Sequence, residues 1–282
     1  MKKTIIKGMS DLGLHINGTD KGPDALNDIC AYADNVITLK KDNVEKELDK
    51  DNKKKNIKYI NKFNNELYNT ILNEENFVIT IGGDHSIAIG SALASSKKFK
   101  DEAIFWIDAH SDYHNMASTI SGNIHGMPLC TITGQNSNDL SEFFDGNYID
   151  PNKCVIIGAR DIEKPEYVNL EKAGVHVFTT QDIKEKGVES VMNEAYNIIK
   201  DTTSLHISYD LDVIDPKIAP GVSVKAIDGI TEEEAYQIMD EILKRKEILK
   251  SFDLVELNPD NDINNTTRDI AYNLLLKLIK NI

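Results

Sequence analysis

The sequence predicts an α/β protein built on a central parallel sheet that helices cover on both faces. Short apolar runs alternate with amphipathic stretches along most of the chain. The runs are apolar almost throughout, as expected of strands that are buried on both sides. The 282 residues contain no repeat, linker or shift in composition, so we expect a single domain over residues 1–282.

Six segments are expected to form strands of this sheet, because each is a short, nearly continuous apolar run. They are FVITIG (77–82), AIFWIDA (103–109), CVIIGA (154–159), VHVF (175–178), SLHISYD (204–210) and SFDLVEL (251–257). Their alternation with helical patterns is typical of strands that pair in parallel.

Amphipathic helices are expected before and between these strands. Apolar residues recur at helical spacing over 57–72, and the stretches 183–200 and 231–249 are also amphipathic. Thr231 is placed to cap the last of these, with three acids in its first turn. The stretch 40–59 is rich in Lys, Asp and Asn with charges of both signs, so we expect a solvated helix or loop.

The composition argues against several classes of partner. The formal net charge of −14 disfavours nucleic acids and anionic membranes, which both attract basic surfaces. The three cysteines show no CxxC spacing and are odd in number, which indicates reduced thiols in the cytoplasm. We see no signal peptide, and no apolar run approaches the roughly 20 residues of a membrane span.

Ionisable residues follow five of the expected strands. In chain order they are Asp84 and His85, then Asp108, His110 and Asp112, then Arg160 and Asp161, then Asp210 and Asp212, and finally Glu256. One such residue alone would be a turn former or a helix cap. Because ligands of open α/β sheets bind at the carboxyl ends of the strands, five such ends together indicate a functional site.

The spacing of these residues indicates a metal site. The ligand-type residues of DAHSD (108–112) alternate along an extended segment and so lie on one side of it, as do Asp210 and Asp212. A calcium loop of the EF-hand type is excluded, because Tyr113 and Thr119 occupy the positions that would need Gly and Glu. Two imidazoles and four carboxylates could hold two divalent cations. Mixed ligation of this kind suits Mn²⁺, with Zn²⁺, Fe²⁺ and Co²⁺ left open.

Three motifs resemble those of the ureohydrolase family, which includes arginase, agmatinase and formiminoglutamase. They are GGDHS (82–86), DAHSD (108–112) and SYDLDVIDP (208–216), and the likeness extends from residue 18 to residue 259. The resemblance implies an arginase-like, three-layer αβα fold that assembles as a homo-trimer or homo-hexamer. It also implies a small guanidino or formimino compound as the substrate.

The same resemblance implies a ligand set for two Mn²⁺ ions. One ion would be held by His85, Asp108, Asp112 and Asp210, and the other by Asp108, His110, Asp210 and Asp212. Asp108 and Asp210 would therefore bridge the ions. A related fold in zinc-dependent deacetylases uses one metal, and His85, Asp112 and Asp212 are the extra ligands that favour two.

Three residues would have catalytic roles by the same resemblance. The two ions would activate a water molecule for attack on the electrophilic carbon. Asp112 would carry a proton to the departing nitrogen, and His125 in SGNIHGMP (121–128) would exchange protons with solvent. Glu256 would bind the guanidinium group by charge-assisted hydrogen bonds.

The loop between the second and third motifs favours an amino-acid substrate. Its length over 112–125 resembles that of arginases, and Thr119 and Ser121 fall where arginases bind the substrate α-carboxylate. Asp161 and Glu163 resemble the acids that approach the α-amino group, with Glu163 in place of a shorter aspartate. These features predict hydrolysis of L-arginine to L-ornithine and urea.

Other residues depart from the arginase pattern. His114 stands where arginases have a carboxylate-binding asparagine, and we expect it to contact the substrate. In IAPGVSVKAIDG (218–229), Val224 replaces a threonine and Lys225 could bind a second carboxylate, as in formiminoglutamases. A formiminoglutamase or an agmatinase-like amidinohydrolase is therefore the alternative. A non-catalytic binding homologue is a third possibility, against which the complete ligand set argues.

Overall fold

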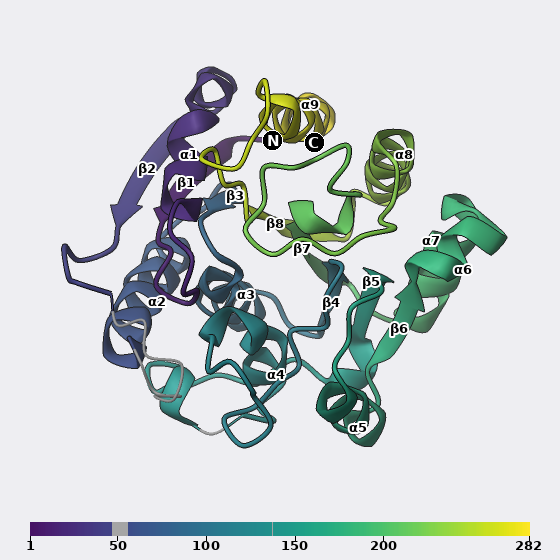
Figure 1. Cartoon of the computed structure of the whole chain (residues 1–282), viewed down its shortest axis with the longest axis horizontal. Coiled ribbons are helices and arrows are strands. Elements are labelled where there is room, and N and C mark those ends of the chain that lie inside the picture. Colours follow the sequence, from purple (N-terminus) through teal and green to yellow (C-terminus); the bar gives the residue numbers. More distant parts are fainter. Residues whose placement is uncertain (47–55, 137) are drawn as a thin grey trace.

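In the computed structural model, eight parallel strands form one central sheet with helices on both faces (Figure 1). The structure describes residues 1–46, 56–136 and 138–282. The strand order is β2-β1-β3-β8-β7-β4-β5-β6. The strands are β1 (Lys3–Met9), β2 (Asn35–Lys40), β3 (Phe77–Gly82), β4 (Glu102–Ile107), β5 (Cys154–Ala159), β6 (His176–Thr179), β7 (Ser204–Asp210) and β8 (Leu249–Val255).

All six strands predicted from the sequence are present, and no boundary differs by more than two residues. The two N-terminal strands, β1 and β2, were not predicted. In β1 the apolar run is broken by Lys7, whose ammonium is buried against the carboxylate of Asp24. In β2 most side chains are exposed, because this strand lies at the edge of the sheet and its sequence is correspondingly mixed.

Helices form the two outer layers. One face of the sheet packs against α2 (Ile57–Leu72), α3 (Ala88–Lys98), α4 (Pro128–Ile132) and α5 (Lys164–Ala173). The other face packs against α1 (Gly22–Ala25), α6 (Thr180–Lys186), α7 (Val188–Ile198), α8 (Glu232–Leu243) and α9 (Thr266–Asn281). The predicted three-layer fold is confirmed, and each face buries its own hydrophobic cluster.

The helices differ in detail from the prediction. The stretch 183–200 is not one helix, because Gly187, at φ 80°, separates α6 from α7. The predicted cap at Thr231 is confirmed: its hydroxyl accepts a hydrogen bond from the Glu234 amide, and the Glu234 carboxylate accepts one from the Thr231 amide. Of the stretch 40–59, residues 47–55 lie outside the described residues.

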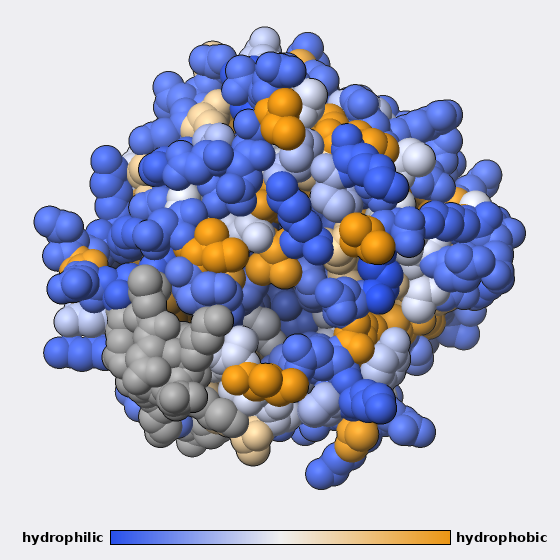
Figure 2. Space-filling model, viewed as in Figure 1, coloured by the Kyte–Doolittle hydropathy of each residue, from blue (hydrophilic) through white to orange (hydrophobic). Residues whose placement is uncertain are grey.

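The surface of the molecule is mostly hydrophilic, as expected for a chain with a formal net charge of −14. Figure 2 shows mostly hydrophilic residues, with hydrophobic side chains in small separate groups. Within the described residues, no helix is long and apolar enough to cross a membrane. The loops that follow β3, β4, β5, β7 and β8 leave the same edge of the sheet, because all the strands are parallel.

Candidate metal centre

His85 is placed by a tight turn directly after β3. The turn requires glycine at position 83, because a Cβ there would collide with the backbone carbonyl of Ser10. Asp84 then caps a short 3₁₀ helix by accepting hydrogen bonds from the amides of Ser86 at 2.8 Å and Gly13 at 2.9 Å. This geometry buries the His85 imidazole at the carboxyl edge of the sheet.

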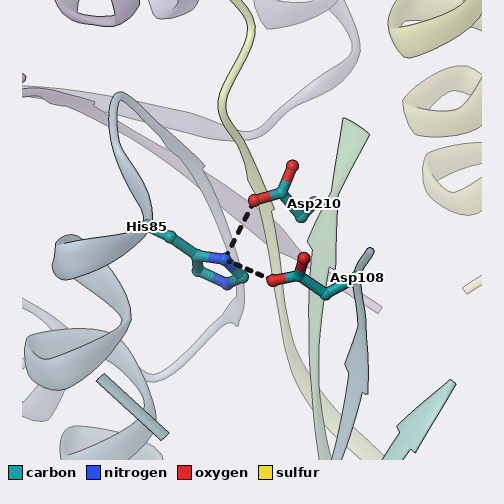
Figure 3. A group of neighbouring side chains, drawn as sticks. All are labelled: His85, Asp108 and Asp210. Atoms are coloured by element: carbon teal, nitrogen blue, oxygen red, sulfur yellow. Dashed lines mark ion pairs between the residues drawn. The ribbon is translucent and has the colours of Figure 1, made fainter. Parts of the chain in front are cut away.

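One nitrogen of His85 faces three carboxylates. Its Nδ1 lies 3.0 Å from Asp108 Oδ2, 3.2 Å from Asp112 Oδ2 and 3.0 Å from Asp210 Oδ2. Figure 3 shows Asp108 and Asp210 converging on this ring. None of the three contacts has the geometry of a hydrogen bond. Four ligand atoms that converge without bonding to one another are the arrangement a bound cation would satisfy.

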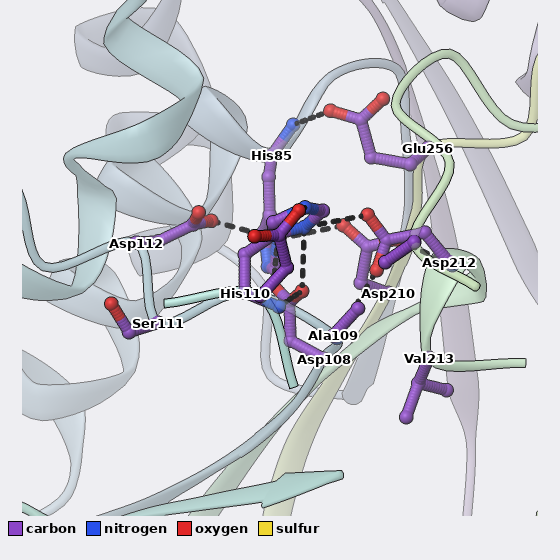
Figure 4. Close-up of polar contacts among 12 residues, drawn as sticks. His85, Asp108, Ala109, His110, Ser111, Asp112, Asp210, Asp212, Val213 and Glu256 are labelled. Carbon is purple, nitrogen blue, oxygen red and sulfur yellow. Dashed lines mark hydrogen bonds and ion pairs between the residues drawn. The ribbon is translucent and has the colours of Figure 1, made fainter. Parts of the chain in front are cut away.

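A second group lies beside the first (Figure 4). His110 Nδ1 lies 3.0 Å from Asp212 Oδ2 and 3.5 Å from Asp108 Oδ1. The described residues contain two sets of three ligand atoms that lie within 4.8 Å of one another: His85, Asp108 and Asp210, and Asp108, His110 and Asp212. Asp108 belongs to both sets, which is the position of a bridging ligand, whereas Asp210 belongs to the first.

The electrostatics of the centre favour cations. Burial, together with the charges of Asp212 and Asp108, raises the pKa of Asp210 well above its usual range. Burial and the charge of Asp108 raise the pKa of Asp112 to about 7. Burial would lower the pKa of His85, but the facing carboxylates raise it well above 6.5. Without a cation the cluster therefore retains protons, and a divalent ion would remove the repulsion that holds them.

Two residues that the sequence analysis did not single out support these ligands. Trp106 donates a hydrogen bond from Nε1 to Asp108 Oδ2 at 2.9 Å, and its ring stacks on His85. Ser208 Oγ lies 2.9 Å from His85 Nε2. Each stands two residues before a ligand, on the same face of its strand, so the alternation of strand side chains was the signal that could have found them.

Arg160 links the loop at Ala226 to the segment that follows β7 and carries Asp212. Its guanidinium donates hydrogen bonds to the carbonyls of Asp212 at 2.7 Å, Ala226 at 2.9 Å and Val213 at 2.9 Å. Burial lowers the pKa of Arg160, although the nearby carboxylates of the centre oppose this. The sequence analysis placed Arg160 at a strand end without assigning it this contact.

Glu256 and His125 lie next to the first ligand group. Glu256 Oε1 accepts a hydrogen bond from the His85 amide at 2.9 Å and lies 3.2 Å from His125 Nδ1. Glu256 Oε2 is buried and has no hydrogen-bond partner in the described part of the chain. Burial would lower the pKa of His125, but the Glu256 carboxylate raises it above 6.5.

Two of the candidate site residues have an unusual backbone conformation. Asp112 has φ 48° and Glu256 has φ 67°, in the left-handed region that disfavours side chains with a Cβ. Such residues cost about 1–3 kcal/mol each and persist where surrounding contacts enforce them. The Glu256 amide is held by the Gly83 carbonyl at 2.8 Å, and the Asp112 carbonyl by the Cys130 amide at 3.3 Å.

The residues predicted to bind the substrate head group lie in loops: Thr119 and Ser121 between β4 and α4, and Asp161 after β5. Thr119 is buried, and its hydroxyl accepts a hydrogen bond from the Gly122 amide at 3.0 Å. The Ser121 hydroxyl accepts one from the Asn123 amide at 3.2 Å. The carboxylate of Asp161 is 64% exposed and lies 3.8 Å from His110 Nε2 at the rim of the centre.

His114 is already engaged by protein groups. Its Nε2 lies 3.2 Å from Glu163 Oε2 and 3.4 Å from Glu166 Oε2, and its Nδ1 lies 3.1 Å from Ser118 Oγ. Both ring nitrogens therefore have partners before any substrate arrives. This arrangement suits a residue that positions Glu163 better than one that binds a carboxylate itself.

The sequence of the chain matches the family model described as the Arginase family over residues 5–280. The chain belongs to the arginase family. An arginase from Brevibacillus brevis is 36% identical over 291 residues, which cover 96% of this chain and 95% of that protein. An arginase from Bacillus subtilis is 35% identical over 212 residues, covering 75% of this chain and 71% of that protein.

Solved arginase structures share the fold. The Entamoeba histolytica arginase in complex with L-ornithine superposes with a TM-score of 0.91 at 29% identity, covering 99% of this chain and 97% of that chain. A Bacillus subtilis formimidoylglutamase, at 19% identity and a TM-score of 0.80, shares the fold alone. This arginase-family chain is therefore a metal-dependent hydrolase of C–N bonds in linear amidines, as the sequence predicted.

Proposed function

We propose that the chain is an arginase that hydrolyses L-arginine to L-ornithine and urea with two bound Mn²⁺ ions. The observation that carries the proposal is the convergence of three carboxylates on His85 Nδ1 without a hydrogen bond, beside a second group that shares Asp108. When bound, the ions would supply an activated water molecule and stabilise negative charge.

The ligand chemistry supports two ions and favours manganese. The first would be held by His85, Asp108, Asp112 and Asp210, and the second by Asp108, His110, Asp210 and Asp212. Four carboxylates and two imidazoles, without any thiolate, form a set that suits Mn²⁺. Burial and the charges of neighbouring carboxylates raise the pKa values of Asp210 and Asp212. Two bound dications would offset these crowded charges, which supports a centre with two ions.

Glu256 offers a site for the guanidinium group. Its Oε2 is a buried acceptor that lacks a partner among the described residues, and a guanidinium supplies planar N–H donors. Its Oε1 is fixed by the amide of His85, so the acceptor is held at a constant position relative to the first metal ligand. The substrate carbon would thereby be presented to the metal centre.

The positions of His125 and Asp112 support roles in proton transfer. His125 touches Glu256, and its side chain is 16% exposed, so it can exchange protons with solvent while it remains beside the guanidinium site. Asp112 Oδ2 lies at the inner side of the centre, 3.2 Å from His85 Nδ1. We assign to Asp112 the transfer of a proton to the departing nitrogen, and to His125 its exchange with solvent.

The surrounding loops favour a substrate with an amino-acid head group. The hydroxyl of Thr119 accepts a bond from the backbone and keeps its proton for donation to a carboxylate. Glu163, fixed by His114, and Asp161 offer acceptors for an α-ammonium group. The Entamoeba histolytica relative was solved with L-ornithine, which is the product that arginine would give.

The proposal also covers assembly and location. We infer a homo-trimer or homo-hexamer in the cytoplasm. The cytoplasmic location is in line with the three cysteines, Cys30, Cys130 and Cys154, which are free thiols in the structure.

The test of the proposed activity is a substrate panel on Mn²⁺-loaded protein: arginine, agmatine, guanidinobutyrate and formiminoglutamate. Release of urea and ornithine from arginine at the highest kcat/KM supports the proposal, and a higher value for any other compound contradicts it.

A further inference from the structure

The loop of residues 10–18 follows β1 and contains no helix or strand (Figure 1). Asp11, Leu12 and Leu14 in this loop are nevertheless buried, each at most 2% exposed. Buried backbone and polar side chains need partners, and a loop without helical or ladder bonds must find them elsewhere. The contacts that the loop makes with other segments therefore determine its conformation.

The backbone of Gly13 joins this loop to two segments of the candidate site. Its carbonyl accepts a hydrogen bond from the His125 amide at 3.1 Å, and its amide donates one to Asp84 Oδ2 at 2.9 Å. The approach is close, since a Cβ at position 13 would lie 2.5 Å from Asp84 Oδ1. The loop thus connects the backbone of His125 to the turn that places His85.

The loop makes two further contacts beside the site. His15 Nδ1 lies 2.8 Å from the side-chain nitrogen of Asn123, two residues before the proton carrier. The Asn17 carbonyl accepts a hydrogen bond from Asn258 at 3.0 Å, two residues after Glu256. The loop therefore bridges the segment that follows β4 and the segment that follows β8.

Two lysines that follow β2 hold the loop from its other side. The buried carboxylate of Asp11 forms an ion pair with Lys41 and lies 3.4 Å from Lys46 Nζ. Lys46 also donates hydrogen bonds to the carbonyls of Asp11 at 2.8 Å and Ile16 at 3.1 Å. The side chain of Lys46 is 8% exposed. One buried ammonium therefore joins the two halves of the loop.

The two lysines differ in what they contribute. Burial lowers the pKa of Lys46, although the charges of Asp11 and Asp84 oppose this. A buried ammonium is costly unless its bonds compensate, and here two of those bonds shape the backbone of the loop. Lys41 pairs with the carboxylates of Asp11 and Asp20, so it would still neutralise Asp11 if Lys46 were replaced.

We propose that Lys46 is a positioning residue for His125 that acts through the loop of residues 10–18. By joining two carbonyls of the loop, Lys46 fixes its shape and so the place of the Gly13 carbonyl, which holds the His125 amide. The imidazole is thereby kept beside Glu256 and within reach of solvent, as proton exchange requires. The inference rests on the proposed function of His125 and names what holds that residue in place.

The first experiment measures how firmly the segment that carries His125 is held. Hydrogen–deuterium exchange of Mn²⁺-loaded protein is followed by mass spectrometry in peptides that cover residues 121–128. Lys46→Met removes the ammonium and leaves Asp11 paired with Lys41, so the fold should persist. The exchange rate of this segment should rise by about 10-fold, because a loosened loop lets the segment open more often.

Lys98→Met is the matched control. Lys98 also donates hydrogen bonds to two backbone carbonyls, those of Ile71 and Glu74, and burial also lowers its pKa. It is the last residue of α3, a helix that begins beside the turn that carries His85 and leads away from it. Exchange of residues 121–128 in this variant should match that of the wild type.

The second experiment measures arginine hydrolysis by the same variants. Lys46→Met should lower kcat by about 10-fold, since a small displacement of an acid–base group has this effect, and added imidazole should restore part of the rate. KM should stay close to the wild-type value, because the Glu256 carboxylate is fixed by the His85 amide. Lys46→Arg keeps the charge and the donors and should retain most of kcat. Bound metal, counted by elemental analysis, should be unchanged throughout.

Several results would overturn the inference. Unchanged exchange in Lys46→Met would reject it, whatever the substrate of the enzyme. An equal rise in Lys98→Met would show that loss of any buried lysine loosens the molecule. A fall in kcat that imidazole does not restore, or that accompanies loss of metal, would show that Lys46 does not act on His125. If exchange rose as expected but the wild type did not hydrolyse arginine, the proposed function would fail and the hold of Lys46 on residues 121–128 would stand.

Discussion

The indole ring of Trp106 lies parallel to the imidazole of His85, with ring centroids 3.9 Å apart and an angle of 5° between the planes. Trp106 is fully buried, is the single tryptophan of the chain, and also donates a hydrogen bond to Asp108. One ring therefore touches a ligand of the first group and the ligand that both groups share. Its environment changes whenever the charge of the centre changes.

We expect the fluorescence of Trp106 to report metal binding. Removal of metal with a chelator should abolish turnover, and titration with Mn²⁺ should restore activity and change the emission together. The changes should end at two ions per chain, as in other two-metal hydrolases. In Trp106→Phe the emission signal should vanish while elemental analysis still finds bound metal. A single ion in fully active protein would contradict the binuclear centre.

Mutations should distinguish a metal ligand, Asp210, from a proton carrier, His125. Asp210→Asn removes a charge that faces His85 Nδ1, so metal content and activity should fall together, the latter by at least about 100-fold. His125→Asn should leave two ions bound and slow kcat by about 100-fold, with partial rescue by added imidazole. Elemental analysis and steady-state kinetics on both variants check this. Equal loss of metal from the two would show that His125 is itself a ligand.

Substrate choice should depend on the loop that contains Thr119 and Ser121. Arginine should be preferred to agmatine by roughly 10- to 100-fold in kcat/KM, because agmatine leaves these hydroxyls without a carboxylate, at a cost of about 1–3 kcal/mol. Thr119→Ala combined with Ser121→Ala should lower kcat/KM for arginine and leave that for agmatine unchanged. If Lys225→Ala proved more damaging and formiminoglutamate the better substrate, the arginase assignment would be wrong.

The stability of the metal-free protein should fall as the pH rises. The pKa of His85 is raised above 6.5 in the folded state, so its contribution is complete below about pH 6.5 and is lost as the pH climbs through the higher folded value. Asp112 acts in the same direction, since its pKa rises from 3.8 to about 7 and its contribution is lost between these values. Urea denaturation of metal-free protein over a pH series measures this. Bound Mn²⁺ should flatten the trend, and an increase of stability with pH would refute it.

Sequence reasoning succeeded for strands with a nearly continuous apolar run and failed for β1 and β2, whose runs are interrupted or mixed. The segments FVITIG and CVIIGA are apolar throughout, because β3 and β5 lie inside the sheet, and their boundaries were predicted to the residue. Strand β1 was missed because a buried lysine interrupts it, and that lysine is tolerated through a carboxylate 17 residues later in the chain. Such a partner becomes visible once the fold is known.

The same limit applies to the site. The common edge at which parallel strands end, together with alternation along each segment, was enough to predict that Asp108, His110 and Asp112 would gather near Asp210 and Asp212. It could not predict stacking of Trp106 on His85, because that contact depends on how two strands and a turn are placed in space. Nor could it show that both nitrogens of His114 are occupied, since Glu163 lies in a distant loop.

The position of β8 has a consequence for biosynthesis. This strand, which begins at Leu249, pairs with β3 on one side and β7 on the other, so it joins the half of the sheet that carries His85 to the half that carries Asp210. A ribosome must therefore release nearly the whole chain before these ligands can meet. Capture of the ion that His85 binds would therefore be a late event of synthesis, and ribosome-bound chains arrested before Leu249 should not hold that ion, whereas Asp108, His110 and Asp212 follow strands that pair directly.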